Sequence, residues 1–131
     1  MLKFDHIAVS VSRLEQSLEF YKQLGFVPDK IWQSPDAALR IALMKNGNAI
    51  LELFCYKNPA PLPDYRKTLP DDLQTLGCKH FALATDDIVS TAKKLSEAGI
   101  ADNPQILKGR LGRDYFFIRD PDGILIEIIQ G

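Results

Sequence analysis

Two histidines and two glutamates stand at matching positions in the two halves of the sequence. His6 and His80 are the only histidines in the chain, and each begins a short strand-like run. Glu52 lies 46 residues after His6, and Glu127 lies 47 residues after His80. Imidazole nitrogens and carboxylate oxygens together suit a divalent ion such as Zn²⁺, Ni²⁺, Co²⁺, Mn²⁺ or Fe²⁺. The pattern predicts a metal site with His6, Glu52, His80 and Glu127 as its four ligands.

The two glutamates stand in apolar surroundings. Glu52 lies between Leu51 and Leu53, and Glu127 lies between isoleucines. A carboxylate in such a strand is expensive to bury unless it is paired or bound to a cation. Taken singly, a histidine at a strand start is more often an ordinary core or surface residue, and a glutamate within a strand can face solvent. The duplicated pair with matched spacing favours metal ligands.

The order of elements also repeats. Alternating and helical hydrophobic patterns predict a strand, a helix and three further strands in the first half. Ser12 is expected to cap the first helix, with Glu15 at the spacing of a capping box, and Gly25 to end it. Asn46-Gly47 predicts a hairpin turn. In the second half, a strand at 80–85, a helix begun by Asp86 or Asp87 and ended by Gly99, and strands at 115–118 and 124–129 follow the same order.

The predicted fold is α+β, with two βαβββ modules forming a curved mixed sheet around the metal site. One domain of 131 residues is expected, with a first module at about 1–57, a linker at about 58–76 and a second module at about 77–131. Four prolines interrupt the linker, where a short helical turn near Asp71 to Leu76 is the only regular structure expected. The linker is either a plain connector or a lid over a pocket.

Composition excludes several classes of partner. The net charge is −1 and the basic residues are scattered, so the chain has no electrostatic footprint for nucleic acid. No apolar run is long enough to span a membrane, and no signal-like leader is present. Cys55 and Cys78 have no CxxC partner, which suits a reducing cytoplasm. A cytoplasmic protein with a small-molecule substrate is expected.

The whole chain from Phe4 to Ile129 resembles the vicinal oxygen chelate superfamily, which includes glyoxalase I, methylmalonyl-CoA epimerase, extradiol dioxygenases and drug-resistance proteins. The resemblance rests on the duplicated βαβββ order, the two His-x-Ala strands, the Leu-Glu-Leu and Ile-Glu-Ile strands and the run Arg119-Asp120-Pro121-Asp122-Gly123. It implies that the four predicted ligands match those of the glyoxalase I-like branch, and that one divalent metal ion is the cofactor.

The resemblance implies metal-assisted enolisation of a small vicinal-oxygen substrate by a lyase or isomerase, with Glu127 or Glu52 as the base. Extradiol dioxygenases and thiol transferases of the superfamily use three protein ligands, and bleomycin-binding members generally lack them. An extradiol-type dioxygenase, a thiol transferase and a binding protein without turnover are therefore the alternatives. A homodimer is the expected assembly, with the site inside one chain or shared between two.

Arg40, Arg113 and Tyr115 are the candidate substrate-binding residues, as polar groups expected near the pocket that could bind an anionic substrate. A solvated strand edge is, however, the commoner place for each of these residue types. Glyoxalase I has arginines for glutathione at three places where this sequence has Ser10, Tyr56 and Leu76. The metal ligands are thus retained while the glutathione-binding residues are replaced.

Overall fold

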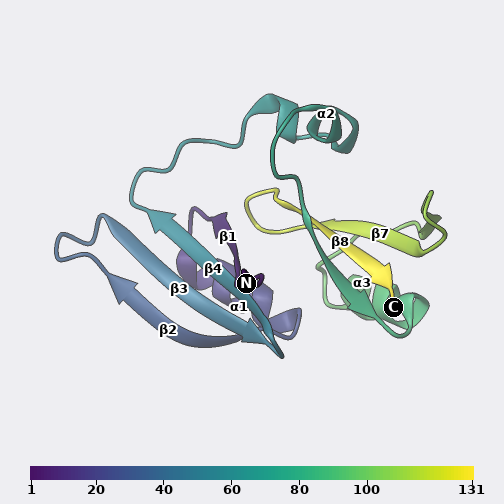
Figure 1. Cartoon of the computed structure of the whole chain (residues 1–131), viewed down its shortest axis with the longest axis horizontal. Helices are drawn as coiled ribbons and strands as arrows, with labels where there is room; N and C mark the ends of the chain where they lie inside the picture. Colours follow the sequence, from purple (N-terminus) through teal and green to yellow (C-terminus); the bar gives the residue numbers. More distant parts are fainter. The chain divides into compact units, whose positions relative to one another are not determined.

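The computed structural model describes all 131 residues and divides into two compact units, Met1–Pro61 and Leu62–Gly131. Each unit contains one four-stranded sheet of parallel and antiparallel strands together with a long helix (Figure 1). The α+β class and the two βαβββ modules predicted from the sequence are confirmed. No helix is long and apolar enough to cross a membrane.

The first unit follows the order strand, helix and three strands. Its elements are β1 (Ile7–Ser10), α1 (Leu14–Gln23), β2 (Val27–Gln33), β3 (Leu39–Asn46) and β4 (Ala49–Tyr56). The strand order is β1-β4-β3-β2, in which β1 runs parallel to β4 and the other pairs are antiparallel. The predicted turn between β3 and β4 is confirmed, with Gly47 at a φ of 56° where a side chain would be strained.

One face of the first sheet is the core face, on which α1 packs. Ala42, Met44, Leu51 and Leu53 on this face are completely buried, as is Tyr21 of α1. These strand residues alternate with the outward-facing ones, as the period of two requires. The opposite face, which carries Glu52, is therefore left for other contacts.

The ends of α1 only partly match the prediction. The helix is capped by Arg13, whose side chain makes no capping hydrogen bond, so the prediction of Ser12 as the cap is wrong. Glu15, the second member of the expected capping box, contacts Arg40 on β3. The C-terminal end is as expected, because Gly25 follows the last turn at a φ of 91°.

The second unit repeats the order after a short helical segment. Its elements are η1 (Asp64–Arg66), α2 (Leu69–Gln74), β5 (Phe81–Thr85), α3 (Ile88–Glu97), β6 (Leu107–Lys108), β7 (Asp114–Arg119) and β8 (Leu125–Gln130). The strand order β5-β8-β7-β6 reproduces that of the first sheet. Of the two aspartates proposed to begin α3, Asp87 is the cap, since its carboxylate accepts a hydrogen bond from the Ser90 amide at 2.9 Å.

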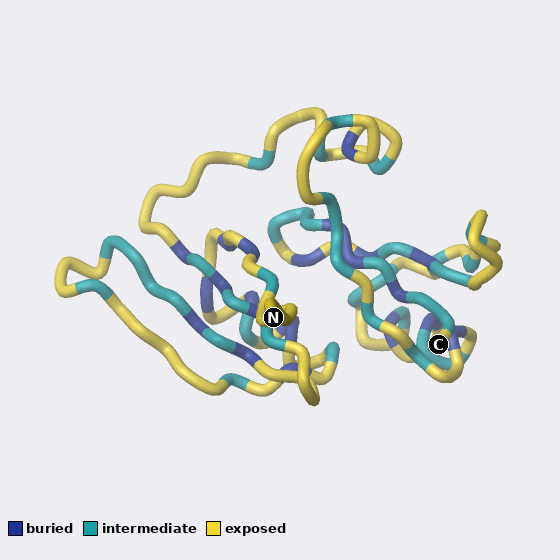
Figure 2. The backbone as a smooth tube through the Cα atoms, viewed as in Figure 1, coloured by how far each residue is buried: buried dark blue, intermediate teal, exposed yellow.

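The segment between the modules has more structure than the prolines suggested. Thr68 caps α2, and the unit boundary at Pro61 places α2 with the second module. Figure 2 shows this segment as mainly exposed, with one buried stretch within α2. Arg119 of β7 donates hydrogen bonds to the carbonyl oxygens of Lys67 and Gly123, at 2.7 and 2.9 Å. The segment from Leu62 onward is thus attached to the second sheet.

Candidate metal centre

The first half of the candidate site joins the start of β1 to the middle of β4. The parallel register pairs Ala8 with Glu52, and alternation places His6 on the same face. His6 Nε2 lies 3.0 Å from Glu52 Oε2. The Glu52 side chain is 21% exposed and that of His6 is 41% exposed, so a small ligand can reach both groups.

A second carboxylate holds the other nitrogen of His6. Asp5 Oδ2 lies 2.7 Å from His6 Nδ1. This hydrogen bond raises the pKa of His6 above its usual value, and the charge of Glu52 adds to the effect while partial desolvation opposes it. A proton held on Nδ1 leaves the lone pair of Nε2 free to bind a cation in the neutral ring. Asp5 was not among the residues predicted for the site. Its position directly before His6 in the sequence could have indicated a contact with the histidine ring.

The second half of the site has the same construction. The register of β5 and β8 pairs Ala82 with Glu127, which is the equivalent of the Ala8 and Glu52 pair. His80 Nε2 lies 3.2 Å from Glu127 Oε2, and both side chains are 19% exposed. The sequence duplication is therefore also a duplication of geometry.

The surroundings of His80 differ from those of His6. The ring of Phe117 packs edge-on against His80 with a centroid distance of 4.8 Å. His80 Nδ1 is buried and has no hydrogen-bond partner. An unpaired buried nitrogen is unusual, since nearly all such atoms find a partner. Phe117 was not predicted, but it lies opposite Glu127 in the β7 and β8 register.

The residues predicted to bind substrate occupy different places. Arg40 pairs with Cys55 in the β3 and β4 register, which puts it on the core face of the first sheet, away from Glu52. Its guanidinium contacts Glu15 of α1. The structure thus does not bring Arg40 together with Glu52, in contrast to what the sequence suggested.

Arg113 and Tyr115 lie in the second unit. Arg113 Nε donates a hydrogen bond to the carbonyl oxygen of Gln130 at 2.7 Å, which holds the side chain at the end of β8. Tyr115 pairs with Ile129 and so shares a face with Glu127. Its ring lies 5.8 Å from that of Phe117. Tyr115 is therefore the predicted substrate-binding residue that accompanies a His–Glu pair.

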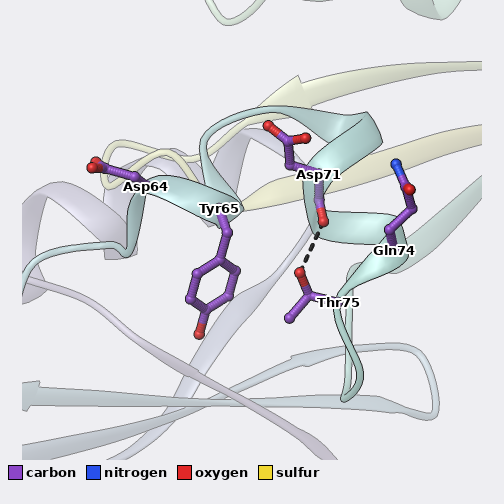
Figure 3. Close-up of a pocket in the computed structure, with 5 residues that line it drawn as sticks. All are labelled: Asp64, Tyr65, Asp71, Gln74 and Thr75. Carbon is purple, nitrogen blue, oxygen red and sulfur yellow. Dashed lines mark hydrogen bonds between the residues drawn. The ribbon is translucent and has the colours of Figure 1, made fainter.

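Within either unit, the site consists of one His–Glu pair. No three or more histidine, cysteine, aspartate or glutamate side chains are gathered in an arrangement that could hold a metal ion. A separate surface pocket of about 360 Å³ is formed by η1 and α2, and it shares no residue with either pair (Figure 3). Its lining residues are Asp64, Tyr65, Asp71, Gln74 and Thr75.

The family of the chain follows from a match over nearly its whole length. Residues 3–128 match the model of the Glyoxalase/Bleomycin resistance protein/Dioxygenase superfamily. The protein belongs to this superfamily. Members of the superfamily commonly use a divalent metal ion, and both glyoxalases and dioxygenases are among them.

Relatives in sequence carry several activities in their names. A glyoxylase I 4 from Arabidopsis thaliana is 30% identical, over 98% of this chain and 70% of the relative. A probable lactoylglutathione lyase from Vibrio cholerae is 28% identical, over 95% of this chain and 88% of the relative. A trivalent organoarsenical cleaving enzyme from Bacillus sp. strain MD1 is also 28% identical, over 93% and 69%. The superfamily is therefore established, and the activities of its members differ.

Solved structures give the same fold. A glyoxalase family protein from Enterococcus faecalis superposes with a TM-score of 0.81 and 25% identity, covering 97% of this chain and 96% of that one. The glyoxalase I of Leishmania major superposes with a TM-score of 0.72 and 19% identity, covering 99% and 87%. At 19% identity the second likeness concerns the fold alone.

Proposed function

We propose that the protein is a divalent-metal-dependent enzyme of the glyoxalase I type, a lyase or isomerase that acts on a small vicinal-oxygen substrate. The observation that carries the proposal is the pair of equivalent His–Glu contacts, at 3.0 Å in the first unit and 3.2 Å in the second. Each contact joins the nitrogen of one histidine to the oxygen of the glutamate that the sequence pattern had matched with it.

The donor atoms fit a metal ion of this class. With metal–ligand bonds of about 2.0 to 2.2 Å, a nitrogen and an oxygen at adjacent positions of one ion lie about 3 Å apart. Two imidazole nitrogens and two carboxylate oxygens also suit a borderline divalent ion. We propose that His6, Glu52, His80 and Glu127 together hold one ion of Zn, Ni, Co, Mn or Fe, either in one chain or in a homodimer.

When bound, the metal would act as a Lewis acid that polarises a carbonyl oxygen of the substrate. The proposed tasks of the protein's own groups are separate from this. Glu52 or Glu127 removes the proton from the carbon next to the carbonyl. The proton then returns to the former carbonyl carbon in an isomerisation, or to the opposite face of the same carbon in an epimerisation. Asp5 keeps the proton of His6 on Nδ1, so that Nε2 faces the site.

The substrate would be bound by groups on the Glu127 face. Tyr115 can donate its phenol hydrogen to a substrate oxygen, while Phe117 supplies an apolar wall. Arg113 retains guanidinium nitrogens beyond the Nε that contacts Gln130, and these can meet an anionic group. Arg40 is left out of the proposal, because its guanidinium contacts Glu15 on the core face.

An activity screen tests the function. Protein loaded separately with each of the five metals is offered a hemithioacetal, an epimerisable α-oxo thioester and a catechol, in buffered D₂O under air. The proposal expects isomerised or epimerised product, with no oxygen consumption. Oxygen uptake with ring cleavage of the catechol would instead identify an extradiol-type dioxygenase. Tight binding of an unchanged substrate would identify a binding protein.

The two free cysteines and the substrate class lead us to place this activity in the cytoplasm.

A further inference from the structure

A cluster of three charged residues around a buried aspartate lies beside the residues that precede β5. We call it the Asp72 cluster; its members are Arg66, Asp72 and Lys79. The carboxylate of Asp72 on α2 is 1% exposed. Arg66 Nε lies 3.1 Å from Asp72 Oδ1, and Lys79 Nζ lies 3.8 Å from the same oxygen. All three residues belong to the second unit.

A buried aspartate is retained only where its charge is compensated. Asp72 has two cations next to it, so the cluster is stable only while both α2 and the residues before β5 keep their places. The exposed pair Lys67–Asp64 in the same segment has no such requirement, because water can replace either partner. The cluster therefore fixes one geometry of the segment.

The cluster reaches the candidate metal ligand through the backbone. Arg66 Nη2 donates a hydrogen bond to the carbonyl oxygen of Lys79 at 3.0 Å, while its Nε contacts Asp72. Lys79 is thus held at its carbonyl and at its side chain, and the next residue is His80. The planar fork of the arginine gives this contact a fixed direction.

His80 needs such support more than His6 does. The Nδ1 atom of His6 is held by Asp5, whereas the residue before His80 is a lysine, and His80 Nδ1 has no hydrogen-bond partner. Apart from the contact of Nε2 with Glu127, the orientation of the His80 ring therefore depends on packing against Phe117 and on the position of its backbone. His80 is therefore positioned by its backbone and by Phe117, and not by a hydrogen bond to Nδ1.

We propose that Arg66 and Asp72 are positioning residues, which hold the backbone before β5 so that His80 faces Glu127. The predicted loss of metal affinity rests on the proposed function. The predicted change in the orientation of the His80 ring does not, because it is measured in the metal-free protein. It assigns a task to the segment between the modules: η1 and α2 hold the backbone that precedes His80 in one half of the proposed metal centre.

The experiment uses the full-length chain and the variant Arg66→Met, with Lys67→Met as the matched control in the same segment. Long-range ¹H–¹⁵N spectra of the imidazole rings report only two histidines, and a His6→Gln sample assigns them. We expect Arg66→Met to shift or broaden the ring signals of metal-free His80, to leave those of His6 and the amide signals of α3 in place, and to weaken Zn²⁺ and Ni²⁺ binding about tenfold in calorimetry. Lys67→Met should change none of these.

Wild-type ring signals for His80 and wild-type metal affinity in Arg66→Met would overturn the proposal and leave the cluster as a mere anchor of α2. If the wild-type chain binds no metal, the proposed function fails, and the His80 ring signals alone decide the positioning role. If Arg66→Met does not fold, Arg66→Lys decides it in the same way, because a lysine keeps the charge beside Asp72 but loses the forked contact to the Lys79 carbonyl. Unmoved His80 signals in Arg66→Lys would then count against the proposal.

Discussion

Ala8 lies opposite Glu52 in the register of β1 and β4, and this one pairing sets where the first half of the candidate site forms. The histidine two residues before Ala8 is thereby brought to the glutamate, with 3.0 Å between the two side chains. Because Ala82 lies opposite Glu127 in the same way, the second pair follows from the same rule. Strand register, not a local motif, brings these residues together.

Replacing the carboxylate of Glu52 or Glu127 with an amide should weaken metal binding. We expect Glu52→Gln and Glu127→Gln each to reduce affinity for Ni²⁺ or Zn²⁺ by at least about tenfold, since an amide is a poorer ligand for these ions than a carboxylate. Isothermal titration calorimetry measures the change. Glu19→Gln, on the exposed surface of α1, is the control and should bind as the wild type does. Equal affinity in both Glu52→Gln and Glu19→Gln would remove Glu52 from the ligand set.

The packing of Phe117 on His80 should matter for stability and for metal binding together. We expect Phe117→Leu to lower the free energy of unfolding by about 1 kcal/mol, because the edge-on aromatic contact is lost. Metal affinity should fall as well, since the ring of His80 gains freedom. Urea denaturation and calorimetry give the two values. A stability loss with unchanged affinity would mean that Phe117 supports the core and not the ligand.

The helix cap offers a prediction about folding alone. Asp87→Ala should destabilise the protein by about 1 kcal/mol, because the Ser90 amide loses its acceptor. Asp86→Ala should have less effect, since the Asp86 contact with Gln130 is made by the backbone carbonyl. Chemical denaturation of both variants compares them. Equal losses would show that the cap bond contributes little.

The contact of Glu15 with Arg40 predicts a pH dependence. The hydrogen bonds of Arg40 lower the pKa of Glu15 to about 2 from 4.5. A lowered folded-state pKa stabilises the fold above the unfolded value, and this contribution is lost as the pH falls from about 4.5 through 2. The pair is largely exposed, so the effect should stay below about 1 kcal/mol. Glu15→Gln should therefore make stability less dependent on pH in this window, with metal affinity at neutral pH unchanged; an identical pH profile would show that the pair contributes nothing.

The duplicated spacing was enough to predict the fold and to select the four candidate ligands. A period-two pattern repeated at nearly equal intervals leaves few alternative arrangements. The side of the first sheet on which Arg40 lies could also have been predicted. With Asn46 opposite Ala49 across the two-residue turn, Leu43 must oppose Glu52 and Arg40 must oppose Cys55, which sets Arg40 on the other side of the sheet. The register of a hairpin was the signal to use.

The Asp72 cluster and the cap of α1 lay beyond reach of the sequence. Arg66 and Lys79 meet Asp72 through a proline-interrupted segment, in which no periodic pattern indicates a buried side. Glu15 stood at the spacing of a capping box, but a partner 25 residues away in sequence bound it instead. Both features involve a tertiary ion pair, which local sequence patterns do not encode.

Metal binding by the purified chain tests the central claim most directly. Calorimetric titration of metal-free protein with Ni²⁺, Zn²⁺ and Mn²⁺ should give one ion per chain for at least one of them. Saturation at about a hundred times the dissociation constant should then stabilise the fold by about 2.7 kcal/mol. The single variants His6→Gln, Glu52→Gln, His80→Gln and Glu127→Gln should each lose most of the affinity. Absence of binding for every metal tried, or full affinity in all four variants, would contradict the proposed metal centre.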